Sequence, residues 1–104
     1  MELSQIKQEL SQVGQVIHRA ALAVQTDSAA QAELRNYLNE LDTQSKQAQQ
    51  MQDPKRLTQV IDTMEVTGER AKSACERNSK LSTPVKTAVE QAYQQISHLK
   101  QQLH

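Results

Sequence analysis

The chain has 104 residues, with 12 lysines and arginines against 12 aspartates and glutamates, one cysteine, two tyrosines and no tryptophan or phenylalanine. This length corresponds to one domain over residues 1–104 and leaves no room for a separate cofactor-binding domain. Zero formal net charge removes the basic field that non-specific binding to nucleic acid or to an anionic membrane needs, so we expect neither partner.

Helix-forming residues dominate the composition, with 17 glutamines, 11 alanines and 10 leucines. Strands favour aromatic and β-branched residues and hairpins favour glycine, whereas this chain is only 2% aromatic and holds two glycines. An all-helical chain with a thin aliphatic core is therefore predicted.

The first predicted helix spans residues 2–25, where apolar side chains alternate at spacings of three and four residues. These residues are Leu3, Ile6, Leu10, Val13, Ile17, Ala20 and Val24. The following break contains no glycine or proline. Ser28 and Gln31 have the spacing of a capping box, which predicts that a second helix begins at residue 28.

The second predicted helix spans residues 28–52 and carries a similar heptad pattern with one polar interruption at Gln44. Its positions are Ala30, Leu34, Tyr37, Leu41, Gln44, Ala48 and Met51. The break after it is well marked, because Asp53 is a good N-cap and Pro54 suits the first helical position.

The third predicted helix, residues 54–79, carries two overlapping apolar rows and therefore a broad apolar face, as a helix with two neighbours needs. One row is Leu57, Val60, Met64, Thr67, Ala71 and Ala74; the other is Leu57, Ile61, Met64, Gly68, Ala71 and Cys75. Thr83 and Pro84 then predict a fourth helix over residues 84–103. Its apolar row is Val85, Val89, Ala92, Ile96, Leu99 and Leu103.

Four helices joined by short loops favour an all-α, up-down-up-down antiparallel four-helix bundle. In the alternative architecture the first two helices merge across residues 26–28 and form a dimeric coiled coil. Gly14 and Gly68 lie inside helices, where each costs about 1 kcal/mol relative to alanine. We interpret both glycines as places where a neighbouring helix packs closely.

The sequence lacks the motifs of the common helical enzymes. Di-iron bundles need Glu-x-x-His, but Gln15 and Gln95 stand three residues before His18 and His98. One cysteine and three scattered histidines do not make a zinc site, and no glycine-rich phosphate loop is present. We interpret Cys75 as a small buried apolar residue. The sequence therefore predicts no enzyme activity, no cofactor and no metal.

His18 is the one candidate for chemistry, because the helical pattern turns it away from the apolar face. The segment Ile17-His18-Arg19-Ala20-Ala21-Leu22 resembles, over six residues, the histidine phosphotransfer domains. These are four-helix bundles whose exposed histidine accepts a phosphoryl group within an Ala-His-x-Leu-Lys-Gly pattern. Ile17, Ala20, Ala21 and Leu22 stand here where that pattern has Ala, Leu, Lys and Gly. His18 as a phosphoacceptor is thus the alternative functional hypothesis.

The main functional hypothesis is a non-catalytic protein interaction or scaffold module that binds a protein partner or a second copy of itself through helix faces. Leu22 and Val66 fall on outer helix faces of a polar chain, and Tyr93 combines apolar area with a polar tip. These three residues are the candidate partner contacts. With no signal peptide, no membrane span and a single cysteine, a soluble protein of the bacterial cytoplasm is expected.

Overall fold

The computed structural model describes residues 2–103, so Met1 and His104 lie outside the part discussed below. It confirms the all-α fold class, and residues 2–103 contain no strand. The four helices are α1 (Leu3–Thr26), α2 (Ala32–Gln50), α3 (Pro54–Arg77) and α4 (Thr83–Leu103).

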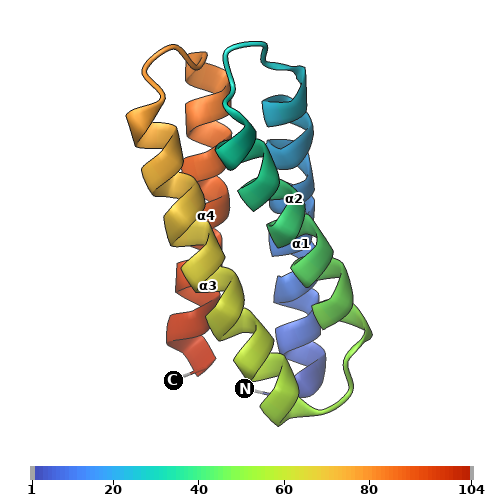
Figure 1. Ribbon diagram of the computed structural model, residues 1–104. Helices are drawn as coiled ribbons and strands as arrows, with labels where there is room; N and C mark the ends of the chain where they lie inside the picture. The colour runs from blue at the N-terminus through green and yellow to red at the C-terminus, as the bar shows by residue number, and fades with distance from the viewer. Residues whose placement is uncertain (1, 104) are drawn as a thin grey trace.

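Each helix runs antiparallel to the next one in the chain, and the start of α1 and the end of α4 lie at the same end of the bundle (Figure 1). The helices pack as a ring in chain order, because α1 contacts α2 and α4, while α3 contacts α2 and α4. The result is a rod with Cα extents of 41 × 21 × 18 Å. The alternative in which the first two helices merge is wrong, because α1 and α2 are separate antiparallel helices.

The core is aliphatic, as the composition predicts. Every heptad position of α1 from Ile6 to Val24 is buried, and so are Val85, Val89, Ala92, Ile96 and Leu99 of α4. Leu3 and Leu103 are half-buried at the end of the rod where the chain begins and ends. Both predicted rows of α3 face the core, apart from the half-buried Val60, because α3 packs against two neighbours.

The start of α2 differs from the prediction. The N-cap is Gln31 and not Ser28, so the predicted capping box does not form. Asp27 explains the later start: its carboxylate accepts a hydrogen bond from the Ala29 amide at 2.9 Å, and its carbonyl accepts one from the Ala30 amide at 3.1 Å. Aspartate makes such turns readily, and this turn occupies residues that the prediction placed in the helix.

Asp27 also joins the two loops at this end of the bundle. Its second carboxylate oxygen accepts a hydrogen bond from the Ser82 amide at 3.1 Å, and the side chain of buried Asn78 donates to the Ala29 carbonyl at 3.0 Å. The backbone hydrogen bonds from Ser82 and then from Ala29 lower the pKa of the Asp27 carboxyl group. The ionised carboxylate is therefore part of the contact between the loops.

The other helix starts agree closely with the sequence signals. The Asp53 side chain accepts a hydrogen bond from the Lys55 amide at 3.0 Å, with Pro54 in the first turn of α3. Helix α4 begins at Thr83, one residue before the predicted start. None of the four helices is apolar enough over a sufficient length to span a membrane.

Candidate functional site

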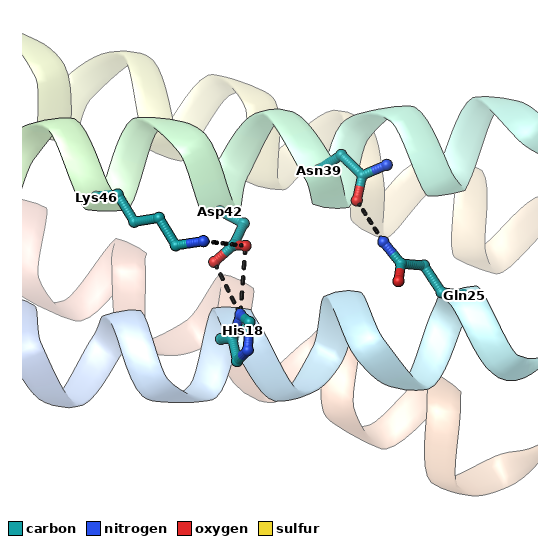
Figure 2. Close-up of polar contacts among 5 residues, drawn as sticks. All are labelled: His18, Gln25, Asn39, Asp42 and Lys46. Atoms are coloured by element: carbon teal, nitrogen blue, oxygen red, sulfur yellow. Dashed lines mark hydrogen bonds and ion pairs between the residues drawn. The ribbon is translucent and has the colours of Figure 1, made fainter.

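His18 lies against a carboxylate of the neighbouring helix. Its Nδ1 atom is 3.3 Å from both side-chain oxygens of Asp42 on α2, and Lys46 Nζ is 3.1 Å from Asp42 Oδ2 (Figure 2). Further along this interface, Gln25 Nε2 donates to Asn39 Oδ1 at 2.9 Å. The predicted exposure of His18 is confirmed, because its side chain is 51% accessible, whereas that of Asp42 is only 17% accessible.

This contact selects one tautomer of the neutral imidazole. A carboxylate can only accept hydrogen bonds, so Nδ1 of His18 carries the proton that points to Asp42. The lone pair then lies on Nε2, which makes no hydrogen bond within residues 2–103. A carboxylate hydrogen-bonded to one ring nitrogen is also the arrangement that orients catalytic and metal-binding histidines.

A shallow groove of about 390 Å³ surrounds this pair between α1 and α2. We call it the α1–α2 groove; it is lined by Ser11, Gly14, Gln15, His18, Arg19, Asp42, Ser45, Lys46 and Gln49. A Cβ atom on Gly14 would lie 2.5 Å from Gln49 Nε2 and 2.8 Å from Ser45 Oγ. The interpretation of Gly14 as a point of close helix packing is therefore supported.

A second groove, of about 410 Å³, runs between α2 and α3. We call it the α2–α3 groove; it is lined by Tyr37, Val66, Glu69, Arg70, Ser73 and Arg77. Val66 is 44% exposed, as its outward position predicts. Arg77 forms a 3.0 Å ion pair with Glu33 of α2, and the Tyr37 hydroxyl donates to the same carboxylate at 3.3 Å.

Tyr93 is engaged within the bundle, where it packs on α3. Its hydroxyl donates to Glu65 Oε1 at 3.5 Å, and Lys72 Nζ lies 5.2 Å from the centre of its ring. Its Cδ1 would be 3.3 Å from a Cβ atom on Gly68, so the ring packs closely on this helical glycine. Burial, and then the charge of Glu65, raise the pKa of the Tyr93 hydroxyl. Much of the Tyr93 ring is therefore already used in intramolecular packing.

The three candidate partner contacts lie on three different faces of the rod. Leu22, 50% exposed, stands on α1 between His18 and Gln25, both of which reach α2. Val66 faces the α2–α3 groove, and Tyr93 covers the contact between α3 and α4. The structure therefore does not bring them together, and each marks a separate surface.

The surroundings of His98 and Cys75 differ from those of His18. His98 is exposed and lies 2.9 Å from the side-chain amide of Gln102. Cys75 is a buried free thiol whose pKa is raised by burial and then by Glu90. Residues 2–103 hold no group of three or more histidine, cysteine or carboxylate side chains placed to bind a metal ion.

Comparison with known proteins adds no assignment. The chain matches no protein-family profile, no curated protein and no solved structure significantly. The two grooves and the residues that line them are therefore the features of the chain that bear on its function.

Sequence reasoning missed the surroundings of His18. Asp42 and Lys46 are recognisable as a helical i,i+4 pair, but Asp42 is 24 residues from His18 and shares no motif with it. The signal that finds the contact is the antiparallel arrangement of α1 and α2: Lys7 of α1 meets Gln49 of α2, His18 meets Asp42, and Gln25 meets Asn39.

Proposed function

We propose that the protein is a non-catalytic interaction module that binds other proteins through its helix faces. The observation that carries the proposal is Val66, a branched apolar side chain that is 44% exposed in the α2–α3 groove. Tyr37 adds aromatic surface beside it, and Arg70 and Arg77 supply cations at the rim. An apolar centre with a polar rim is the usual composition of a protein-binding surface.

A helix laid along this groove would cover Val66 and part of Tyr37, which removes apolar area from water at a gain of about 25 cal/mol per Å². Tyrosine and arginine are also the side chains that contribute most to binding energy at interfaces. We place this module in a reducing compartment such as the bacterial cytoplasm, because its one cysteine is a buried free thiol.

The test compares two matched substitutions on different faces. Tagged wild-type protein, Val66→Glu and Leu22→Glu are used for affinity capture from the cells that produce the protein, followed by mass spectrometry. We expect a partner that binds wild type and Leu22→Glu and is lost with Val66→Glu, while far-UV circular dichroism shows equal helicity for all three. Equal capture by wild type and Val66→Glu would refute docking in the α2–α3 groove.

Phosphoryl transfer through His18 is the second candidate, and the Asp42 carboxylate at 3.3 Å from Nδ1 is the observation that favours it. The free Nε2 lone pair would attack phosphorus, and the N–P bond would form as the bond to the leaving group breaks. The proton on Nδ1 would stay hydrogen-bonded to Asp42, which stabilises the positive charge of the phosphorylated ring. Lys46 and Arg19 are the cations of the groove nearest in sequence to this pair.

Labelling with phosphoramidate, which releases ammonia when it phosphorylates histidine, tests this second candidate. We expect an acid-labile phosphoprotein that disappears with His18→Ala and forms at least tenfold more slowly with Asp42→Asn, since a neutral amide orients the ring less firmly. His98→Ala is the matched control and should label normally. No label on wild type, or equal labelling of His18→Ala, would exclude this chemistry at His18.

A further inference from the structure

On the α2–α3 side of the rod, α2 carries two exposed acids and α3 two exposed bases, and the exposed acid Glu69 of α3 lines the same groove beside Arg70. Glu33 and Glu40 stand one heptad apart on α2, and Arg70 and Arg77 stand one heptad apart on α3, all four being exposed. A heptad corresponds to about 10.5 Å along a helix and returns to nearly the same side. We use the name α2–α3 face for the surface formed by these four residues and Val66.

The two rows are level with each other. The ion pair between Glu33 and Arg77, 3.0 Å long, sets the register of the antiparallel helices. A step of one heptad forward on α2 and one heptad back on α3 then brings Glu40 level with Arg70. The hydrogen bond from Gln44 Nε2 to Thr67 Oγ1, at 3.3 Å, shows that this register continues along the face.

Glu40 and Arg70, the second pair of charges on this face, are not joined by an ion pair, and the Glu40 carboxylate accepts a hydrogen bond from Gln44 Nε2 at 3.4 Å. Neither Glu40 nor Arg70 forms an ion pair with any residue between 2 and 103. Some acids beside the neighbouring grooves are paired: Asp42 with Lys46 on the α1–α2 side, and Glu65 with Lys100 on the α3–α4 side. On the α2–α3 face, these two charges can therefore pair with a partner at the same height along the rod as the apolar residues of the face.

A partner that complements this face must present bases opposite α2 and acids opposite α3, with the same spacing. The face itself meets that requirement after a half-turn about an axis parallel to the rod, because α3 of one copy then lies on α2 of the other at the same level. Arg70 faces Glu40 of the second copy, and Arg77 faces Glu33. The antiparallel arrangement instead sets arginine against arginine and is disfavoured.

From this complementarity we infer that the α2–α3 face binds a second copy of this chain in parallel, as an isologous dimer; this inference rests on the proposed function of helix-face binding. At each of the two levels, the dimer forms a square of two arginines and two glutamates with alternating sign, and such networks stabilise more than isolated surface pairs do. Val66 lies one helical turn from Arg70 and would be covered by α2 of the second copy.

The face is long enough for an interface of ordinary size. A face of the rod is 41 Å long and about 20 Å wide, so full coverage would involve roughly 800 Å² per copy, the area per partner of a standard-size interface. Because Val66 and Tyr37 are its main apolar residues, charge pairing decides which copies associate and in which orientation.

Sedimentation equilibrium of the full chain at low and high salt tests the inference. We expect a wild-type dimer whose dissociation constant increases with salt. Arg70→Glu and Glu40→Arg should each increase that constant at least tenfold, since the two-fold axis repeats every change twice. The double variant Arg70→Glu with Glu40→Arg restores opposite charges and should regain the wild-type constant. Arg19→Glu, the same charge change on exposed α1 surface, is the matched control and should have no effect.

Mixing the two single variants gives a further check. Arg70→Glu carries two acids at this level and Glu40→Arg two bases, so an equimolar mixture should form a heterodimer although neither associates well alone. A wild type that stays monomeric, a double variant as weak as the singles, or a mixture that does not associate would overturn the inference. If the wild type is monomeric but still captures a partner through Val66, the proposed function stands without self-association.

Discussion

Two buried hydroxyl groups in the bundle, those of Ser45 and Thr67, differ in their hydrogen bonds. Ser45 and Thr67 are 2% and 3% exposed. Thr67 Oγ1 donates to the Thr63 carbonyl at 3.2 Å and accepts from Gln44 Nε2 at 3.3 Å. Ser45 Oγ, which faces Gly14, has no hydrogen-bond partner among residues 2–103. Removal of the Ser45 hydroxyl should therefore stabilise the protein, and removal of the Thr67 hydroxyl should destabilise it.

The expected magnitudes follow from the cost of an unpaired group. A buried donor without a partner costs about 1–3 kcal/mol, and alanine gains a few tenths of a kcal/mol over serine in helix propensity. Ser45→Ala should thus increase the free energy of unfolding by about 1 kcal/mol, or about 4 °C in Tm for a chain of this size. Thr67→Val keeps the shape, loses two hydrogen bonds and should decrease the free energy by about 1 kcal/mol.

Urea denaturation followed by far-UV circular dichroism measures both changes. Ser73→Ala, at an exposed position of α3, gives the helix-propensity gain alone and is the matched control. The gain of Ser45→Ala over this control is the quantity of interest. If the free energy of unfolding increases no more in Ser45→Ala than in Ser73→Ala, the Ser45 hydroxyl does not lack a partner in solution. A bound water then satisfies it, and the prediction is wrong.

Three further predictions follow from the glycines, the loop contact and the thiol. Gly14→Ala should decrease the free energy of unfolding by about 1 kcal/mol, because overlap with Ser45 outweighs the gain in helix propensity. This decrease should be smaller in a Ser45→Ala background. Gly68→Ala, with its nearest contact at 3.3 Å, should increase the free energy of unfolding by about 0.5 kcal/mol in the same urea assay. Because folding lowers the pKa of Asp27, the ionised carboxylate stabilises the folded state at neutral pH, and this stabilisation is lost as the pH falls below about 4. Asp27→Asn should therefore reduce the difference in Tm between pH 7 and pH 3. Cys75, buried with a raised pKa, should react with a thiol reagent far more slowly in the folded than in the urea-unfolded protein, and equal rates would contradict its burial.

The heptad pattern identifies the core residues of α1 and α4, but it identifies only part of those of α2. The pattern predicted Tyr37 and Gln44 in the core row, yet these are half-buried, and Leu38 and Ser45 are buried in their place. A straight helix drifts relative to a strict seven-residue repeat, and a helix with two neighbours buries a broader face. Ser45 in the core was not predictable from polarity, because only the close approach at Gly14 brings a serine to that position.

Helix boundaries were predictable where a strong local signal exists. Asp53 and Pro54 fixed the start of α3, since the cap and the proline act within the same turn. The weaker signal at Ser28 did not decide the start of α2, because Asp27 binds two backbone amides, one of them the distant Ser82. A contact between two loops far apart in sequence leaves no local pattern.

Both candidate sites consist of pairs across neighbouring helices, and this explains why sequence alone identified only half of each. His18 and Val66 were recognisable as outward residues, but their significance comes from Asp42 on α2 and from the level charges Glu40 and Arg70. These pairings depend on the register set by the loops before and after α2. One residue more or less at a helix end shifts every side chain by about 1.5 Å along the helix and 100° around it. The loops therefore decide whether these surface charges meet, while the apolar rows decide only that the helices pack.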